Sequence, residues 1–411
     1  MTEQSRNRGW IVTFSGTGIN LALGVLYAWS VIKAAIETRI DAGAWTWDKA
    51  SLNDPYVVAL VVFAFMMIPG GRMLDKWGPR ITSSVGGLLV GLGFLVASSS
   101  SSLWVWILGF GCLAGSGIGL AYAAATPAAI KWFPPRRTGL IAGLVISGFG
   151  LAAAYIAPLA THMQRSYGIG STMLILGLIF LVVVIGLSQL LSNPPEGFKP
   201  QETTEQTATK ASAAPVDCTW KEMMSTPAFW LIWFVFFIGA GAGLMVIGAA
   251  NSMAKAAFAE TAWLALTVLA LGNAAGRIIA GSLSDKIGRK ATLVAFMLFQ
   301  AAIIFSLLAM PKDSATLILL VATLIGFNYG SNLTLFPSIT KDFFGLKNFG
   351  LNYGIVFTAW GVGGFVLARV SQMLFENTGS LDYSCIMAGS LLVLGALLAL
   401  MIRPPKTRPA N

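Results

Sequence analysis

The stretch Gly71-Arg-Met-Leu-Asp75-Lys76-Trp-Gly78 returns in the second half of the chain as Gly281-Ser-Leu-Ser-Asp285-Lys286-Ile-Gly288. Both copies read G-x-x-x-D-K-x-G and both are followed by basic residues. Their first glycines lie 210 positions apart in a chain of 411 residues. A repeat at about half the chain length indicates that the two halves are built alike, which is the internal signature of many secondary transporters.

The composition excludes an ordinary soluble protein. Hydrophobic residues make up 56% of the chain and charged residues only 11%, whereas soluble domains carry roughly 25% charged residues. The mean hydropathy of +0.74 points the same way. The net charge of +10 is spread between apolar runs rather than gathered in one stripe, so we expect no nucleic-acid partner. These values predict an integral protein of the lipid bilayer.

Twelve apolar runs fall into two groups of six, which predicts an all-α membrane protein with twelve transmembrane helices in two pseudo-symmetric bundles. The expected domains are an N-terminal bundle at 1–191, a cytoplasmic linker at 192–227 and a C-terminal bundle at 228–411. Within the linker, Thr219-Trp-Lys-Glu222 fits a capping box that starts a short helix. The runs lie near 10–32, 55–74, 81–98, 103–128, 139–160, 171–191, 228–250, 261–282, 291–310, 315–337, 350–370 and 381–402.

The distribution of cations predicts the orientation. With both termini inside, 19 of the 27 Lys and Arg residues fall in cytoplasmic segments, 7 fall outside, and Arg277 alone lies within a span. The positive-inside rule therefore places both termini in the cytoplasm. The first apolar run, 10–32, is too long for the core of a signal peptide. We expect a multi-pass protein of the cell (plasma or inner) membrane.

The paired motif resembles the signature loops of the major facilitator superfamily, which join helices two to three and eight to nine. Further stretches are similar to the oxalate/formate exchanger family, which belongs with the monocarboxylate porters. The resemblance implies the major facilitator fold, and for the motif residues a role in latching helix ends in one of the alternating states. The alternative is that these charges only satisfy the positive-inside rule. The motif residues are Arg72, Asp75, Lys76, Arg80, Asp285, Lys286 and Arg289, and the further stretches are Leu26-Tyr27-Ala28-Trp29-Ser30, Lys131-Trp-Phe-Pro-Pro-Arg136-Arg137, Thr219-Trp-Lys-Glu222 and Phe343-Phe-Gly-Leu-Lys-Asn-Phe-Gly350.

The sequence departs from this family pattern at two positions. The oxalate exchanger carries a second binding cation, a lysine, in span eleven, where this chain has Trp360. Animal monocarboxylate porters carry an acid four residues before the arginine of span eight, where this chain has Asn273.

Arg277 is the most informative candidate residue. A cation at that depth costs several kcal/mol unless it is partnered, and such residues mark substrate paths. The planar guanidinium matches a carboxylate bidentately, and Asn273 lies one turn away on the same helix face. The alternatives are that Arg277 snorkels to the interface and that Asn273 bonds between helices.

Further polar and aromatic groups are expected at the depth of Arg277. Tyr27 and Tyr122 match family positions that line the cavity. Asn328, Tyr329 and Trp360 are the other candidates for substrate binding, with core packing as the alternative for each. Trp360 in place of a second cation favours a monoanion.

No Asp or Glu lies deep in a span. If protons are co-transported, Glu260 or Asp54 near the outer mouth, or the substrate itself, must carry them. We find no nucleophile–base set, metal cluster or phosphate loop within the spans, so we expect no catalytic site, no cofactor and no metal.

Together these features predict a secondary active transporter of small monocarboxylates of the lactate, pyruvate or formate type. We expect it to be proton-coupled and monomeric and to work by alternating access, with Arg277 binding the carboxylate. The alternative is an oxalate/formate-type anion exchanger. A more remote one is a transporter-like carboxylate receptor.

Overall fold

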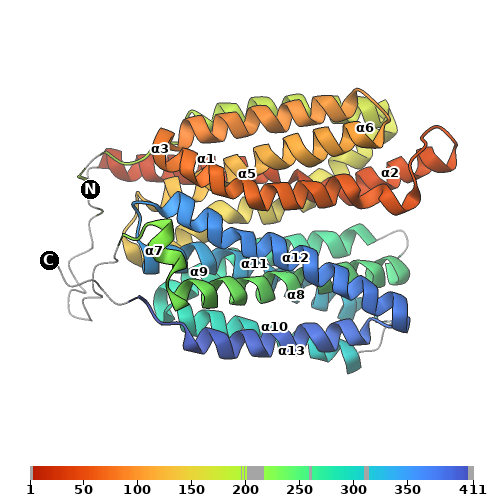
Figure 1. The fold of residues 1–411 in the computed structure, drawn as a ribbon. Helices are drawn as coiled ribbons and strands as arrows, with labels where there is room; N and C mark the ends of the chain where they lie inside the picture. The colour runs from red at the N-terminus through yellow and green to blue at the C-terminus, as the bar shows by residue number, and fades with distance from the viewer. Residues whose placement is uncertain are drawn as a thin grey trace.

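The computed structural model describes residues 3–195, 197–198, 200, 217–258, 262–309 and 314–405. Within these ranges every regular element is a helix (Figure 1). The elements of the first half are α1 (Glu3–Leu23), η1 (Gly24–Ala28), α2 (Trp29–Asp41), η2 (Lys49–Asn53), α3 (Asp54–Ser98), α4 (Leu103–Trp106), η3 (Ile107–Ala114), α5 (Gly115–Ile130), η4 (Pro135–Arg137) and α6 (Thr138–Ser188). Those of the second half are α7 (Trp220–Met224), α8 (Pro227–Phe258), α9 (Ala262–Ile287), α10 (Arg289–Ala309), α11 (Ala315–Phe344), α12 (Phe349–Thr378) and α13 (Asp382–Met401).

Two of these helices are pairs of spans joined at a sharp bend. α3 has 45 residues and α6 has 51, which at 1.5 Å per residue is roughly 68 and 77 Å, about twice the bilayer core. α3 bends at Gly78, with φ of 81°, and α6 bends at Gly168, with φ of 76°. Only glycine adopts such angles freely. The last glycine of the second motif copy, Gly288, also has a positive φ of 92°.

The described residues contain nine apolar helical segments long enough to cross a membrane. Dividing α3 and α6 at their bends gives two more spans, and α9, which carries Arg277, supplies the twelfth. The predicted set of twelve spans is therefore recovered.

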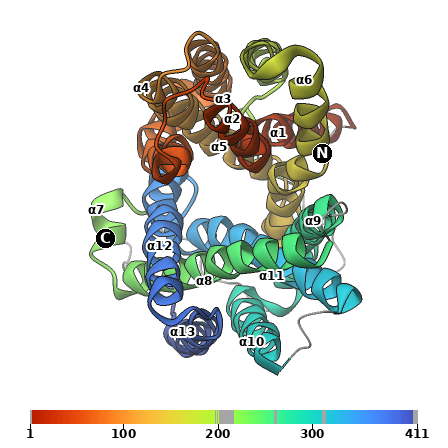
Figure 2. The same ribbon diagram turned by 90° about the vertical axis from the view of Figure 1, so that its right-hand side faces the viewer.

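The helices lie in two groups, α1–α6 and α8–α13, one beside the other (Figure 2). α1 begins, and α13 ends, at the same end of the molecule as α7 (Figure 1), and we call this the linker end. The Thr219 side chain and the Glu222 side chain form the predicted capping box at the start of α7. The domain boundaries at 192 and 227 stay a prediction, and residues 201–216 lie outside the described part.

Two helix pairs make the most extensive contacts between the groups, α6 with α9 and α3 with α12. Both seams are closed by glycines at the linker end. Gly139 of α6 lies against the backbone of Gly281, and Gly350 of α12 lies against the backbone of Gly71. A Cβ atom at Gly139 or Gly350 would overlap the opposite main chain, so these seams require glycine.

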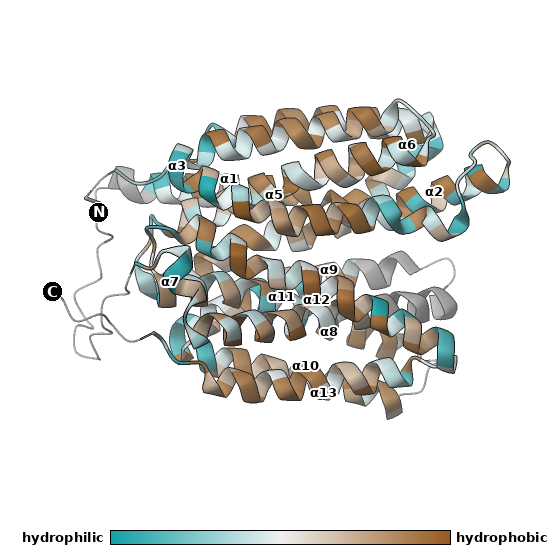
Figure 3. Ribbon diagram, viewed as in Figure 1, coloured by the Kyte–Doolittle hydropathy of each residue, from teal (hydrophilic) through white to brown (hydrophobic). Residues whose placement is uncertain are grey.

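Large apolar side chains cover the outside of both groups. Brown, hydrophobic residues predominate along the middle of the helices, and teal, hydrophilic residues gather toward the ends (Figure 3). Leu178, Leu271 and Leu397 are among the large hydrophobics exposed there. Such continuous apolar surface is unfavourable in water and suits a lipid environment.

Candidate functional site

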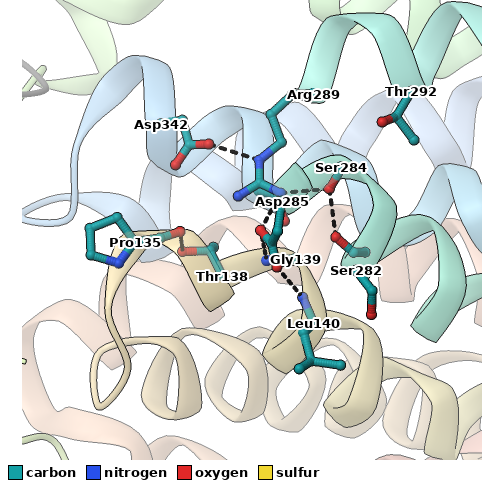
Figure 4. A network of polar contacts seen from close by, with 12 residues as sticks. Pro135, Thr138, Gly139, Leu140, Ser282, Ser284, Asp285, Arg289, Thr292 and Asp342 are labelled. Atoms are coloured by element: carbon teal, nitrogen blue, oxygen red, sulfur yellow. Dashed lines mark hydrogen bonds and ion pairs between the residues drawn. The ribbon is translucent and has the colours of Figure 1, made fainter. Parts of the chain in front are cut away.

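Asp285 caps a helix of the opposite bundle (Figure 4). Its Oδ1 accepts a hydrogen bond from the amide of Gly139 and its Oδ2 one from the amide of Leu140, both at 2.9 Å. These amides belong to the first turn of α6, where the free N–H groups and the helix dipole favour an anion. The carboxylate also forms an ion pair with Arg289 at 2.6 Å.

Asp75 makes the equivalent contact on the other seam. Its carboxylate accepts hydrogen bonds from the amides of Gly350, at 3.1 Å, and Leu351, at 2.9 Å, in the first turn of α12. Each copy of the motif therefore places its aspartate on a helix N-terminus of the opposite bundle. The two contacts join the bundles at the linker end of the molecule.

The two aspartate caps differ in their neighbouring charged groups and in their exposure. Arg289 also donates to Asp342 at 2.8 Å, and the side chain of Asp285 is only 8% exposed. Nearby, the Lys341 ammonium donates to the Thr138 hydroxyl at 2.5 Å, across the seam. Asp75 is more exposed, and Trp132 stands at the position equivalent to Asp342, 210 residues earlier. The cap made by Asp285 is thus the more strongly supported of the two.

A lysine lies beside each aspartate at the same repeat spacing. Lys131 follows α5, and Lys341 lies near the end of α11. Burial lowers the pKa of the Lys131 ammonium, and the nearby Asp75 carboxylate raises this pKa in part. The positive charge of Lys131 stabilises the ionised form of Asp75, which is the form that caps α12.

Arg277 is fully buried in the seam between α9 and α6. Its Nε donates to Asn273 Oδ1 at 2.7 Å, and its Nη1 donates to the main-chain oxygen of Ile146 at 2.5 Å. Among the described residues, none accepts a hydrogen bond from its Nη2. The exposed fraction of Arg277 is 0%, so the side chain turns into the seam and not toward the interface, as snorkelling would require.

Tyrosine side chains from both bundles lie near Arg277. The hydroxyl of Tyr27 is close enough to interact with Arg277 and Asn273. Tyr122 and Tyr329 also lie within the electrostatic reach of the guanidinium. The indole of Trp360 donates to the Tyr329 hydroxyl at 2.8 Å. A buried cation with several phenol groups near it has the chemistry to bind a small anion.

A family model for the Major Facilitator Superfamily matches residues 10–258 and 241–411. The chain belongs to the Major Facilitator Superfamily. Its matched relatives in this superfamily are transporters, not enzymes. The chain is 29% identical over 371 residues to the uncharacterized MFS-type transporter YhjX of Escherichia coli (strain K12), with 88% of each chain covered.

Two further superfamily relatives are named for the anions that they transport. The oxalate:formate antiporter of Oxalobacter formigenes is 29% identical over 346 residues, covering 82% of this chain and 77% of that protein. Monocarboxylate transporter 13 of Rattus norvegicus is 28% identical over 400 residues, covering 94% and 87%. The resemblance to the oxalate/formate and monocarboxylate group is therefore confirmed.

Solved structures confirm the superfamily fold. The proton:xylose symporter XylE superposes with a TM-score of 0.73 at 14% identity, over 97% of each chain. The human organic anion transporter MFSD10 gives a TM-score of 0.71 at 14% identity, covering 96% of this chain and 99% of that one. The chain is thus an all-α, multi-pass membrane transporter of this superfamily.

The structure brings most of the predicted binding residues together near Arg277, and for Asn328 it shows only a hydrogen bond within its own helix. The Asn328 amide nitrogen donates to Leu324 of its own helix at 3.0 Å, and its side-chain oxygen is buried without a donor among the described residues. Asp54 lies at the start of α3, at the end opposite the linker end. Glu260 lies outside the described residues. The roles of all these residues stay predictions.

The remaining motif cations do not join the caps. Arg72, Lys76 and Lys286 are exposed, and Lys76 lies over the ring of its neighbour Trp77, at 5.9 Å from the ring centroid. Arg80 donates to the main-chain oxygen of Leu191 at 2.7 Å, within its own bundle. Their part in gating stays a prediction.

Several residues of the site were not predicted from the sequence. Main-chain acceptors such as that of Ile146 leave no signal in a sequence. Lys341 and Asp342 could have been found, because Lys131 and Lys341 lie 210 positions apart, as do the motif copies. The aromatic rings of Phe63, Phe149 and Phe357 also meet at the centre, but aromatic residues are too common in membrane spans to single these out.

Proposed function

We propose that this chain is a secondary active transporter of small monocarboxylates of the lactate, pyruvate or formate type, with Arg277 binding the carboxylate. One observation carries the proposal: Arg277 is fully buried and its Nη2 has no acceptor among the described residues. A buried cation is strongly unfavourable unless an anion or good acceptors compensate it. A substrate carboxylate supplies both the charge and the acceptor.

The two fixed nitrogens support this role. Asn273 and the Ile146 carbonyl hold Nε and Nη1, so the guanidinium plane is oriented before a ligand arrives. Such preorganisation removes part of the entropic cost of binding. Because Ile146 belongs to α6 of the other bundle, opening of this seam would break the Nη1 bond, and substrate binding would be coupled to the alternating access of the two bundles.

The direction of access follows from the caps and from the positive-inside rule. The aspartate caps close the linker end, which we propose is cytoplasmic, as are both termini. We propose that the protein works as a monomer in the cell membrane. For proton coupling, Arg277 has no acidic partner among the described residues. The proton is therefore carried by Asp54 or Glu260 at the outer mouth, or by the substrate itself.

The second candidate is an oxalate/formate-type exchanger, which the likeness to the Oxalobacter formigenes antiporter favours. Against it stands Trp360, whose indole is bonded to Tyr329 where a second cation would be needed. One cation balances one carboxylate and leaves the second charge of oxalate uncompensated.

Uptake into proteoliposomes tests the proposal. Wild-type protein should take up labelled lactate or pyruvate, faster with an inward proton gradient, and Arg277→Gln should abolish uptake. Arg369→Gln is the matched control because Arg369 is exposed and bonds only to Gln372 among the described residues. Uptake by Arg277→Gln would refute the role of Arg277. Uptake of the label only into proteoliposomes that contain oxalate would favour the oxalate/formate-type exchanger.

A further inference from the structure

The polar pair on α9 has an apolar counterpart on α3. Asn273 and Arg277 lie four residues apart, and 210 positions earlier the chain has Phe63 and Met67. The same spacing relates the two motif copies and the lysines beside them. One half of the repeat thus carries an amide and a guanidinium where the other half carries a ring and a thioether.

The structure places the two pairs at equivalent points of the two seams. Gly143 of α6 lies against the backbone of Arg277, and Gly354 of α12 lies against the backbone of Met67. The neighbouring contacts, Gly139 with Gly281 and Gly350 with Gly71, follow the same order. Met67 is therefore the counterpart of Arg277 in space as well as in sequence.

Phe63 joins the apolar counterpart to the centre of the molecule. Its ring centroid lies 5.3 Å from those of Phe357 and Trp360 in the other bundle, and 5.4 Å from that of Tyr122. Phe63 is 1% exposed and Met67 is 0% exposed. Tyr122, which contacts the Phe63 ring, also lies within the electrostatic reach of Arg277, so it links the apolar group to the charged group.

We infer that the substrate site has two unlike poles, a charged pole of Arg277 and Asn273 and an apolar pole of Phe63, Met67, Phe357 and Trp360. The carboxylate binds at the charged pole, and the short tail of the acid lies against Phe63, which sets the tail length accepted. A second carboxylate at the apolar pole would meet rings and a thioether instead of a cation. This inference deepens the proposed function and depends on it.

Binding of a series of straight-chain acids tests the inference. Acetate, propionate, butyrate and valerate would be titrated into purified full-length protein, with binding measured by calorimetry. Wild-type protein should lose affinity once the tail exceeds the space at Phe63. Phe63→Ala should move this limit to a longer acid, with a gain of about fourfold per added methylene. Phe65→Ala is the matched control, because Phe65 is 49% exposed on the same helix, and it should leave the series unchanged.

Two further variants keep the inference falsifiable. If Phe63→Ala fails to fold, Phe63→Leu should shift the limit in the same direction by a smaller amount. The double variant Phe63→Asn with Met67→Arg copies the charged pole and should bind malonate at least tenfold more tightly than wild-type protein does. An unchanged chain-length series in a folded Phe63 variant, or no gain for malonate, would overturn the inference. If wild-type protein binds none of the monocarboxylates, the proposed function is wrong, and the inference that depends on it is wrong as well.

Discussion

Asp75 and Gly350 lie 275 positions apart in the sequence, yet the Asp75 carboxylate accepts a hydrogen bond from the Gly350 amide at 3.1 Å. The same relationship joins Asp285 to Gly139 across the other seam, at 2.9 Å. The duplicated motif is thus used twice, each time to bind one bundle to a helix N-terminus of the other.

Removing the charge of Asp75 should weaken the closed linker end. Asp75→Asn keeps an acceptor oxygen but loses the attraction to the α12 N-terminus, worth about 0.3–1 kcal/mol. Spin labels on cysteines at Trp77 and Lys347 would report the distance between the bundles, in a protein lacking its three native cysteines. We expect the longer-distance population to rise roughly two- to fivefold. An unchanged distribution would mean that Asp75 does not hold the seam.

Asp285→Asn should have the larger effect on the same distance distribution. The Asp285 side chain is nearly buried. Removing its charge also breaks its ion pair with Arg289. Breaking a buried ion pair costs several kcal/mol. Lys290→Gln serves as the control because Lys290 is exposed next to Arg289 and is not one of the motif residues expected to latch the bundles. Equal effects of Asp75→Asn and Asp285→Asn would contradict the conclusion that the cap made by Asp285 is the more strongly stabilised of the two.

A methyl group at Gly139 should force the α6–α9 seam apart. Its Cβ would overlap the Gly281 backbone and approach Arg289, so Gly139→Ala should lower the thermal midpoint and open the linker end. Gly186→Ala, in the same helix, has no atom within 4 Å of the added Cβ. It should be neutral, or stabilising by up to about 1 kcal/mol through helix propensity. Equal midpoints for the two variants would refute the close contact.

Loss of the Tyr27 hydroxyl should weaken substrate binding without unfolding the protein. Tyr27 is close enough to interact with Arg277 and Asn273, and its ring packs on Phe149 at 5.7 Å, a contact that Tyr27→Phe keeps. One hydrogen bond to a charged group is worth about 1.5–3 kcal/mol, so the dissociation constant of lactate should rise at least tenfold. An unchanged dissociation constant of lactate would show that Tyr27 takes no part in substrate binding.

The sequence predicted the helices better than it predicted the site. Apolar runs mark the spans, whereas the positive φ angles of Gly78 and Gly288, the last glycines of the motif copies, are seen only in the structure. Arg277 stood out because a cation is costly in a span. The Ile146 carbonyl could not be foreseen, because every residue carries one and only tertiary packing selects it. Asn328 was grouped with the site by depth alone, yet its amide bonds within its own helix.

The central claim is that the free Nη2 of Arg277 binds the substrate carboxylate, and equilibrium binding of lactate to purified protein tests it most directly. Wild-type protein and the variants Arg277→Gln and Arg277→Lys would be titrated under identical conditions. Because Arg277→Lys removes the guanidinium Nη2 that makes the charge-assisted contact, we predict a dissociation constant at least tenfold larger for Arg277→Lys and no measurable binding for Arg277→Gln. Lactate binding by folded Arg277→Gln with the wild-type constant would contradict the account.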